Sequence, residues 1–336
     1  MNLKSDCKNR KMFAYLKIFR HKIKIFSIFV WVLRPNYYDM EQMHDYIIAS
    51  FRLRLVGEAA DLVAMGLRGF EPFEVKSEGE PLLTVKTGCE IDLDNIEREV
   101  LTEFDFEQGQ ALCTFARNEQ YWIFYISSQD MPTHIFLYDR QGGGVECNAG
   151  AVATSPSFVR FGLWFVLNIA TVGHLTAAVH TSVIVKDGRA VMFLGESGTG
   201  KSTHTRLWLD NISGAELLND DSPFVACDDE GAMVYGSPWS GKTPCYKNEC
   251  YPLRAMVRLS QAPHNAIKQL RGVRAIGALL PSLPPAFVFD KALENALLSV
   301  LSKVLGKVKV YHLECLPDIA AAELSFITVF DDEVTG

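Results

Sequence analysis

Residues 195–202, GESGTGKS, place two glycines, a lysine and a hydroxyl at a spacing that could bind phosphate. Gly195, Gly200, Lys201 and Ser202 satisfy the pattern G-x-x-x-x-G-K-[ST]. Glycines allow the backbone to turn so that successive N–H groups face phosphate oxygens, and the N-terminus of a following helix adds positive potential. The Lys201 ammonium would bridge the outer phosphates, and the Ser202 hydroxyl would ligate Mg²⁺. The stretch predicts a nucleotide site with contacts from Gly195, Ser197, Gly198, Thr199, Gly200, Lys201, Ser202 and Thr203.

Two adjacent carboxylates follow this stretch at the end of the apolar run ELLN. Asp220 comes 19 residues after Lys201, a separation that accommodates one helix and one strand. A carboxylate at a strand end can hold Mg²⁺, and a second one can accept a proton from an attacking hydroxyl. The alternative is a solvated acidic turn. Beside the glycine-rich stretch, we predict that Asp220 and Asp221 are catalytic and that they bind metal together with Ser202.

A histidine precedes the same region. His180 stands at the start of the strand-like run HTSVIV, which KDGR separates from the second run AVMFL. If the two runs pair as a hairpin, His180 lies near Gly195, where an imidazole could orient the acidic pair. A lone histidine on a strand is more often structural, so the prediction that His180 is catalytic depends on the neighbouring motif.

These three features together resemble a known family. The residues HTSVIV, GESGTGKST and LLNDDSPFV resemble the catalytic domain of HPr kinase/phosphorylase, whose wider kin have phosphoenolpyruvate carboxykinase-like folds. The resemblance covers roughly residues 174–330. It implies that Lys201 and Ser202 bind nucleotide phosphates and Mg²⁺. It also implies that Asp220 and Asp221 share metal binding and proton abstraction, supported by His180.

The segment after the acidic pair departs from that family. The family has a glutamate and an Arg-Gly-Leu-Gly run there, whereas this chain reads GSPWSGKTPCYKNECYPLRAMVRL. The difference argues against HPr itself as substrate and against phosphorolysis. In GSPWSGK, three glycine and proline positions shape a loop that could present Lys242 to a transferring phosphoryl group. A surface turn with a solvated lysine is the alternative.

The elements that would position these residues fall into an α/β pattern. Short runs rich in β-branched and aromatic residues predict an antiparallel β-rich domain over 40–153. A helix capped by Ser155 is then expected, apolar nearly all round and buried between layers. A catalytic domain of the P-loop kinase type is expected over 154–336, with later helices over 264–282, 290–308 and 317–330.

Composition limits the class of protein. The chain has 336 residues and a net charge of −7, and residues 1–39 alone carry +7, so the remainder is strongly acidic. An acidic body argues against nucleic acid as a partner. Eight scattered cysteines with no CxxC pair favour free thiols and a cytoplasmic location. The apolar run within 1–39 is too short to span a membrane. Three interpretations of this basic extension stay open: an amphipathic surface helix, a poor signal peptide, or a segment that precedes the true start near Met40 or Met43, which we favour.

We therefore expect an ATP- and Mg²⁺-dependent kinase that phosphorylates a hydroxyl, such as a serine or threonine of a protein or peptide. Two alternatives stay open. One is a carboxykinase-like lyase, which would need arginines for substrate carboxylates, and no such cluster is visible. The other is a nucleotide-dependent binding protein without turnover. The sequence leaves open whether the chain forms a homo-oligomer, what accepts the phosphoryl group, and whether ATP or GTP is preferred.

Overall fold

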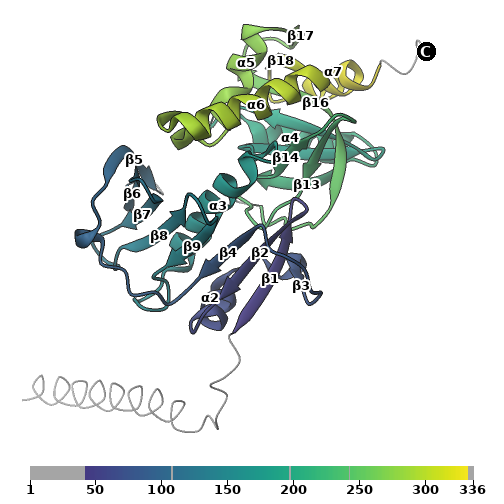
Figure 1. The fold of residues 1–336 in the computed structure, drawn as a ribbon. Helices are drawn as coiled ribbons and strands as arrows, with labels where there is room; N and C mark the ends of the chain where they lie inside the picture. The colour runs from purple at the N-terminus through teal and green to yellow at the C-terminus, as the bar shows by residue number, and fades with distance from the viewer. Residues whose placement is uncertain (1–41, 107–108, 197, 242, 332–336) are drawn as a thin grey trace, which may run out of the picture. The chain divides into compact units, whose positions relative to one another are not determined.

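The computed structural model describes residues 42–331, except 107–108, 197 and 242. The chain from Gln42 onward forms one compact unit. The predicted extension over 1–39 lies outside the described residues, as do the predicted site residues Ser197 and Lys242. The described chain is mixed α/β and contains two nine-stranded sheets (Figure 1). The predicted domain boundary between residues 153 and 154 falls between these sheets in the sequence and stays a prediction.

The first sheet is built from residues 43–147. Its strands lie in the order β3-β1-β2-β4-β9-β8-β7-β6-β5. Their bounds are β1 (Met43–Ile48), β2 (Phe51–Val56), β3 (Glu74–Val75), β4 (Leu83–Lys86), β5 (Glu99–Phe106), β6 (Ala111–Arg117), β7 (Tyr121–Ser127), β8 (His134–Asp139) and β9 (Gly144–Cys147). The expectation of an antiparallel sheet is wrong for two pairs, since β4 runs parallel to both β2 and β9. The chain crosses over through a helix and β3 before β4, so β4 starts from the same end as β2.

The second sheet carries the predicted site. Its strands lie in the order β10-β14-β15-β16-β12-β11-β13, with β18 beside β16 and β17 beside β18. Their bounds are β10 (Thr176–Ala178), β11 (Thr181–Lys186), β12 (Arg189–Leu194), β13 (Glu216–Asp221), β14 (Phe224–Cys227), β15 (Ala232–Tyr235), β16 (Cys250–Gln261), β17 (Ala266–Leu270) and β18 (Lys309–Cys315). Strands β12, β16 and β18 are mutually parallel, so their carboxyl ends meet at one edge of the sheet.

The hairpin of β11 and β12 has the predicted register. Asp187 and Gly188 at its turn both have positive φ, 50° and 71°, as a two-residue type I′ turn requires. Thr181 pairs with Leu194 across the hairpin. The residues just outside this pair are His180 and Gly195, so the histidine does lie at the end of the hairpin where the glycine-rich stretch begins.

The helices are α2 (Ala60–Gly66), α3 (Pro156–Val172), α4 (Lys201–Asn211), α5 (Val273–Leu279), α6 (Lys291–Lys307) and α7 (Ile319–Phe330). Short 3₁₀ turns are η1 (Glu71–Phe73), η2 (Leu93–Asn95), η3 (Leu280–Ser282) and η4 (Pro285–Phe289). Ser155 stands at the N-cap of α3, but its side chain makes no capping hydrogen bond and contacts the Ser157 hydroxyl instead. The expected helix over 264–282 is wrong in its first half, where β17 pairs with β18.

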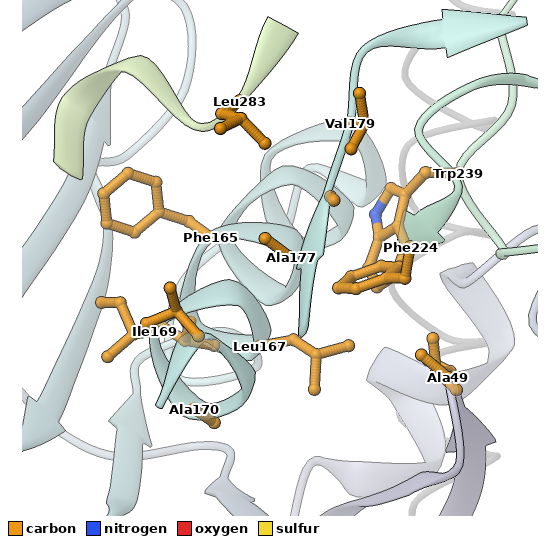
Figure 2. Close-up of a cluster of buried hydrophobic side chains, with 14 of the residues drawn as sticks. Ala49, Phe165, Leu167, Ile169, Ala170, Ala177, Val179, Phe224, Trp239 and Leu283 are labelled. Carbon is orange, nitrogen blue, oxygen red and sulfur yellow. The ribbon is translucent and has the colours of Figure 1, made fainter. Parts of the chain in front are cut away.

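Helix α3 is the centre of the larger hydrophobic core. Its phenylalanine Phe165 stacks on Phe124 of β7, with ring centroids 4.1 Å apart. Figure 2 shows side chains of α3 beside Ala177 of β10 and near Phe224 of β14, so one buried cluster joins residues of both sheets. A second cluster packs α4 and α7 on the opposite face of the second sheet. Among the described residues, no helix is long and apolar enough to cross a membrane.

Candidate functional site

The glycine-rich loop, residues 195–200, connects β12 to α4, whose first two residues are Lys201 and Ser202. Gly200 occupies the N-cap of α4 with φ +98°, a left-handed conformation that a side chain would strain. Thr199 closes a turn within the loop because its hydroxyl donates to the carbonyl of Glu196 at 2.8 Å. Ser202 and Thr203 lie exposed in the first turn of α4. The predicted strand–loop–helix arrangement is present, and it directs the N-terminus of an eleven-residue helix to the loop.

Lys201 lies over the loop that precedes it. Its ammonium nitrogen donates to the carbonyl oxygens of Gly195, at 2.6 Å, and Glu196, at 3.1 Å. Partial burial lowers the pKa of Lys201, and the charges of Asp221 and Asp220 oppose that shift. The strand register places these groups together: Thr181 of β11 pairs with Leu194, the last residue of β12, on one side and with Asp221 on the other, so the acidic pair lies at the end of the sheet where the loop begins. The loop cation and the acidic pair therefore belong to one site.

The two aspartates end β13. One contacts Ser182 near the start of the neighbouring strand β11, and the other contacts His180, which directly precedes that strand. The buried Ser182 hydroxyl donates a short hydrogen bond to Asp220 Oδ1. His180 Nδ1 lies 3.1 Å from Asp221 Oδ1. The side chains of His180 and Asp221 remain 51% and 39% exposed. One carboxylate is thus fixed by a buried hydroxyl, and the other faces solvent beside an imidazole.

A loop over residues 236–241 packs against the backbone of the acidic pair and is hydrogen-bonded to it. The amide of buried Asn219 donates to the carbonyl oxygens of Ser237, at 3.3 Å, and Trp239, at 3.1 Å. The Gly241 N–H donates to the Asp220 carbonyl at 2.6 Å, and a Cβ on Gly241 would lie 2.8 Å from that oxygen. Glycine is therefore required for this close approach. Lys242, the next residue, is outside the described residues, so its predicted role stays a prediction.

Sequence reasoning missed several polar residues around the site. Ser182 interrupts an apolar strand, and Asn219 is a buried amide directly before the acidic pair. Arg258 lies on β16 beside the last residue of β12, where its guanidinium contacts Glu196 of the glycine-rich loop at 3.3 Å. A polar residue inside a buried run is the signal that could have found each one. A groove of about 550 Å³ between α5 and α6 contains none of the predicted site residues.

Comparison with known proteins adds a distant similarity. No family model matches the chain, and no curated protein matches it. Among solved structures it is similar to the HPr(Ser) kinase/phosphatase from Coxiella burnetii. The identity is 11% and the TM-score 0.28, over 47% of this chain and 96% of that chain. The similarity is too weak to assign a role to any residue, so those roles depend on the geometry described above.

Proposed function

We propose that the chain is an ATP-dependent phosphotransferase that moves the terminal phosphoryl group to a hydroxyl, with a serine or threonine of a protein or peptide as acceptor. One observation carries this proposal. Asp220 and Asp221 end β13 at the same end of the sheet as Leu194, which the glycine-rich loop and Lys201 at the start of α4 follow, because Leu194 and Asp221 both pair with Thr181. A cation for phosphates and acids for metal and proton are the parts that phosphoryl transfer needs.

The donor atoms near the loop suit Mg²⁺, which prefers hard oxygen ligands. The Ser202 hydroxyl and the carboxylates of Asp220 and Asp221 are such oxygens. Asp220 is the better metal ligand of the two acids, because its buried bond from Ser182 fixes its orientation. Mg²⁺ bound with the nucleotide would neutralise charge on the transferring phosphoryl group.

Asp221 is then the base. Its exposed carboxylate can accept the proton of the acceptor hydroxyl, whose oxygen forms a bond to the terminal phosphorus. The bond from that phosphorus to the bridging oxygen breaks, and the nucleoside diphosphate leaves with the electron pair. His180, at 3.1 Å, orients the Asp221 carboxylate. Lys201 would turn from the loop carbonyls to the phosphate oxygens when nucleotide binds.

The test separates binding from chemistry. ATP·Mg²⁺ binding is measured by calorimetry, and turnover by mass spectrometry of a serine-, threonine- and tyrosine-containing peptide library. Lys201→Met should weaken binding by about 10-fold or more, because it removes a charge-assisted contact. Asp221→Asn should leave binding nearly unchanged and lower phosphopeptide formation by roughly 10²–10⁴-fold, the usual contribution of a general base. Arg206→Met, on the exposed face of α4, is the charge control.

Two results would contradict the proposal. If the wild-type protein binds no nucleotide, the site is not a nucleotide site. If it binds ATP but yields neither phosphopeptide nor ADP, the chain is a nucleotide-dependent binding protein without turnover.

A further inference from the structure

Arg258 is a cation placed inside a buried strand. It lies in a register row with Leu194, the last residue of β12, and with His312 of β18. Its neighbours Val257 and Leu259 are fully or almost fully buried, and its own side chain is 21% exposed. The row lies at the carboxyl end of β12, where the glycine-rich loop begins. Ligands in α/β sheets bind outside the carboxyl ends of parallel strands.

The contacts of Arg258 are longer than strong ionic hydrogen bonds. One guanidinium nitrogen donates to the Ala278 carbonyl at 3.2 Å, and the other terminal nitrogen to Glu196 Oε1 at 3.3 Å. Charge-assisted bonds of this kind normally measure about 2.7–2.9 Å. The Glu196 side chain is 79% exposed, so water can replace the guanidinium at its carboxylate with little loss. The ion pair of Arg258 and Glu196 is therefore a weak interaction between the loop and β16.

Arg258 and Lys201 also contact the same residue of the loop, because Arg258 donates to the Glu196 carboxylate at 3.3 Å and Lys201 donates to the Glu196 carbonyl at 3.1 Å. Burial is the main cause of the lowered pKa of Lys201, and the positive charge of Arg258 lowers this pKa further. Two cations therefore converge on one loop, and an anion bound there would relieve their mutual repulsion. A guanidinium has a planar set of donors that matches phosphate oxygens in pairs.

We propose that Arg258 is a second phosphate-binding residue, which leaves Glu196 and pairs with the terminal phosphate of a bound nucleoside triphosphate. The inference rests on the proposed function, because it needs the nucleotide site. Glu196 competes with that phosphate for the guanidinium in the free protein. Arg258 thus makes the site prefer a triphosphate over a diphosphate, which lacks the terminal group.

The experiment compares affinities for ADP·Mg²⁺ and for a non-hydrolysable ATP analogue with Mg²⁺. The ratio of the two dissociation constants is the readout, because a structural defect would weaken both. Arg258→Met should weaken binding of the ATP analogue by about 10- to 100-fold and binding of ADP by less than about 3-fold. Arg258→Lys should recover little of the affinity for the ATP analogue, since an ammonium lacks the paired donors of a guanidinium. Glu196→Gln should strengthen binding of the ATP analogue by about 2- to 5-fold. Arg206→Met should change the affinity for neither nucleotide.

Glu196→Gln keeps the test decisive if Arg258→Met fails to fold, because Glu196 is a surface side chain. The inference would be overturned if Arg258→Met lost equal affinity for both nucleotides, or if Glu196→Gln bound the ATP analogue more weakly. Either result would leave the proposed function intact. Loss of all nucleotide binding in the wild-type protein would instead overturn both.

Discussion

At the scale of single residues, the site assigns different surroundings to two identical side chains. Asp220 accepts from a buried serine, and Asp221 lies beside a half-exposed histidine. The sequence predicted the pair and the histidine because all three follow from local spacing and one hairpin register. It did not predict the contact between Glu196 and Arg258, because these residues are 62 positions apart. Contacts of that kind depend on which strands become neighbours.

A histidine away from the site gives a pH-dependent prediction. His134 is fully buried; its Nδ1 lies 2.9 Å from the Pro132 carbonyl, and its Nε2 accepts from the Ser155 N–H. Burial lowers the pKa of His134 below the ordinary 6.5. Below pH 6.5 the unfolded chain therefore binds more protons than the folded protein, and stability falls as pH falls through this range. The contribution is at most about 1.4 kcal/mol per pH unit.

Urea unfolding at pH 7.5, 6.5 and 5.5 checks this expectation. The wild-type protein should lose more free energy of unfolding between pH 6.5 and 5.5 than His134→Gln, which cannot titrate there. Identical slopes for the two proteins would show that His134 does not contribute.

At the scale of elements, the local sequence pattern predicted correctly those elements whose structure depends mainly on their own residues. The hairpin turn, the glycine-rich loop and the helix α6 were all predicted; the structure adds that Asp290 caps α6. The segment Ala266–Leu270 was predicted as helix because it is rich in residues that favour helices, yet it forms β17. Pairing with the edge of β18 overrides that preference. The seven-residue helix α2 was missed because it is too short for a helical period to show.

Asn219 links two elements, and its removal tests how much the site depends on that link. Asn219→Ala should destabilise the protein by about 2–4 kcal/mol, because it leaves the carbonyls of Ser237 and Trp239 and the N–H of Ser222 buried without this partner. It should also lower turnover, since the loop that contacts Asp220 is no longer fixed. Chemical denaturation and the peptide assay measure the two effects. Asn248→Ala, which removes an exposed amide bonded to Pro72, is the control. An unchanged midpoint for Asn219→Ala would contradict the expectation.

At the scale of the molecule, the sequence predicts two domains, and in the structure one buried cluster contains residues of both sheets. Helix α3 connects them, and Arg117 of β6 adds an ion pair to Asp290, the N-cap of α6, at 2.9 Å. The sequence pattern predicts a boundary between residues 153 and 154, but it does not reveal how much apolar surface the two parts share. That surface decides whether they unfold together.

Phe165→Ala tests the shared core directly. The ring stacks on Phe124 of the first sheet and contacts Phe287 of η4 at a centroid distance of 5.7 Å. Its loss should destabilise the protein by about 3–5 kcal/mol. Because the cluster serves both sheets, tryptophan fluorescence and far-UV circular dichroism should report one coincident transition in the wild-type protein and in Phe165→Ala, shifted to lower urea in the variant. Exposed Phe289→Ala should shift it little. Two separated transitions, with only one moved by Phe165→Ala, would instead establish that residues 40–153 and 154–336 fold as independent domains.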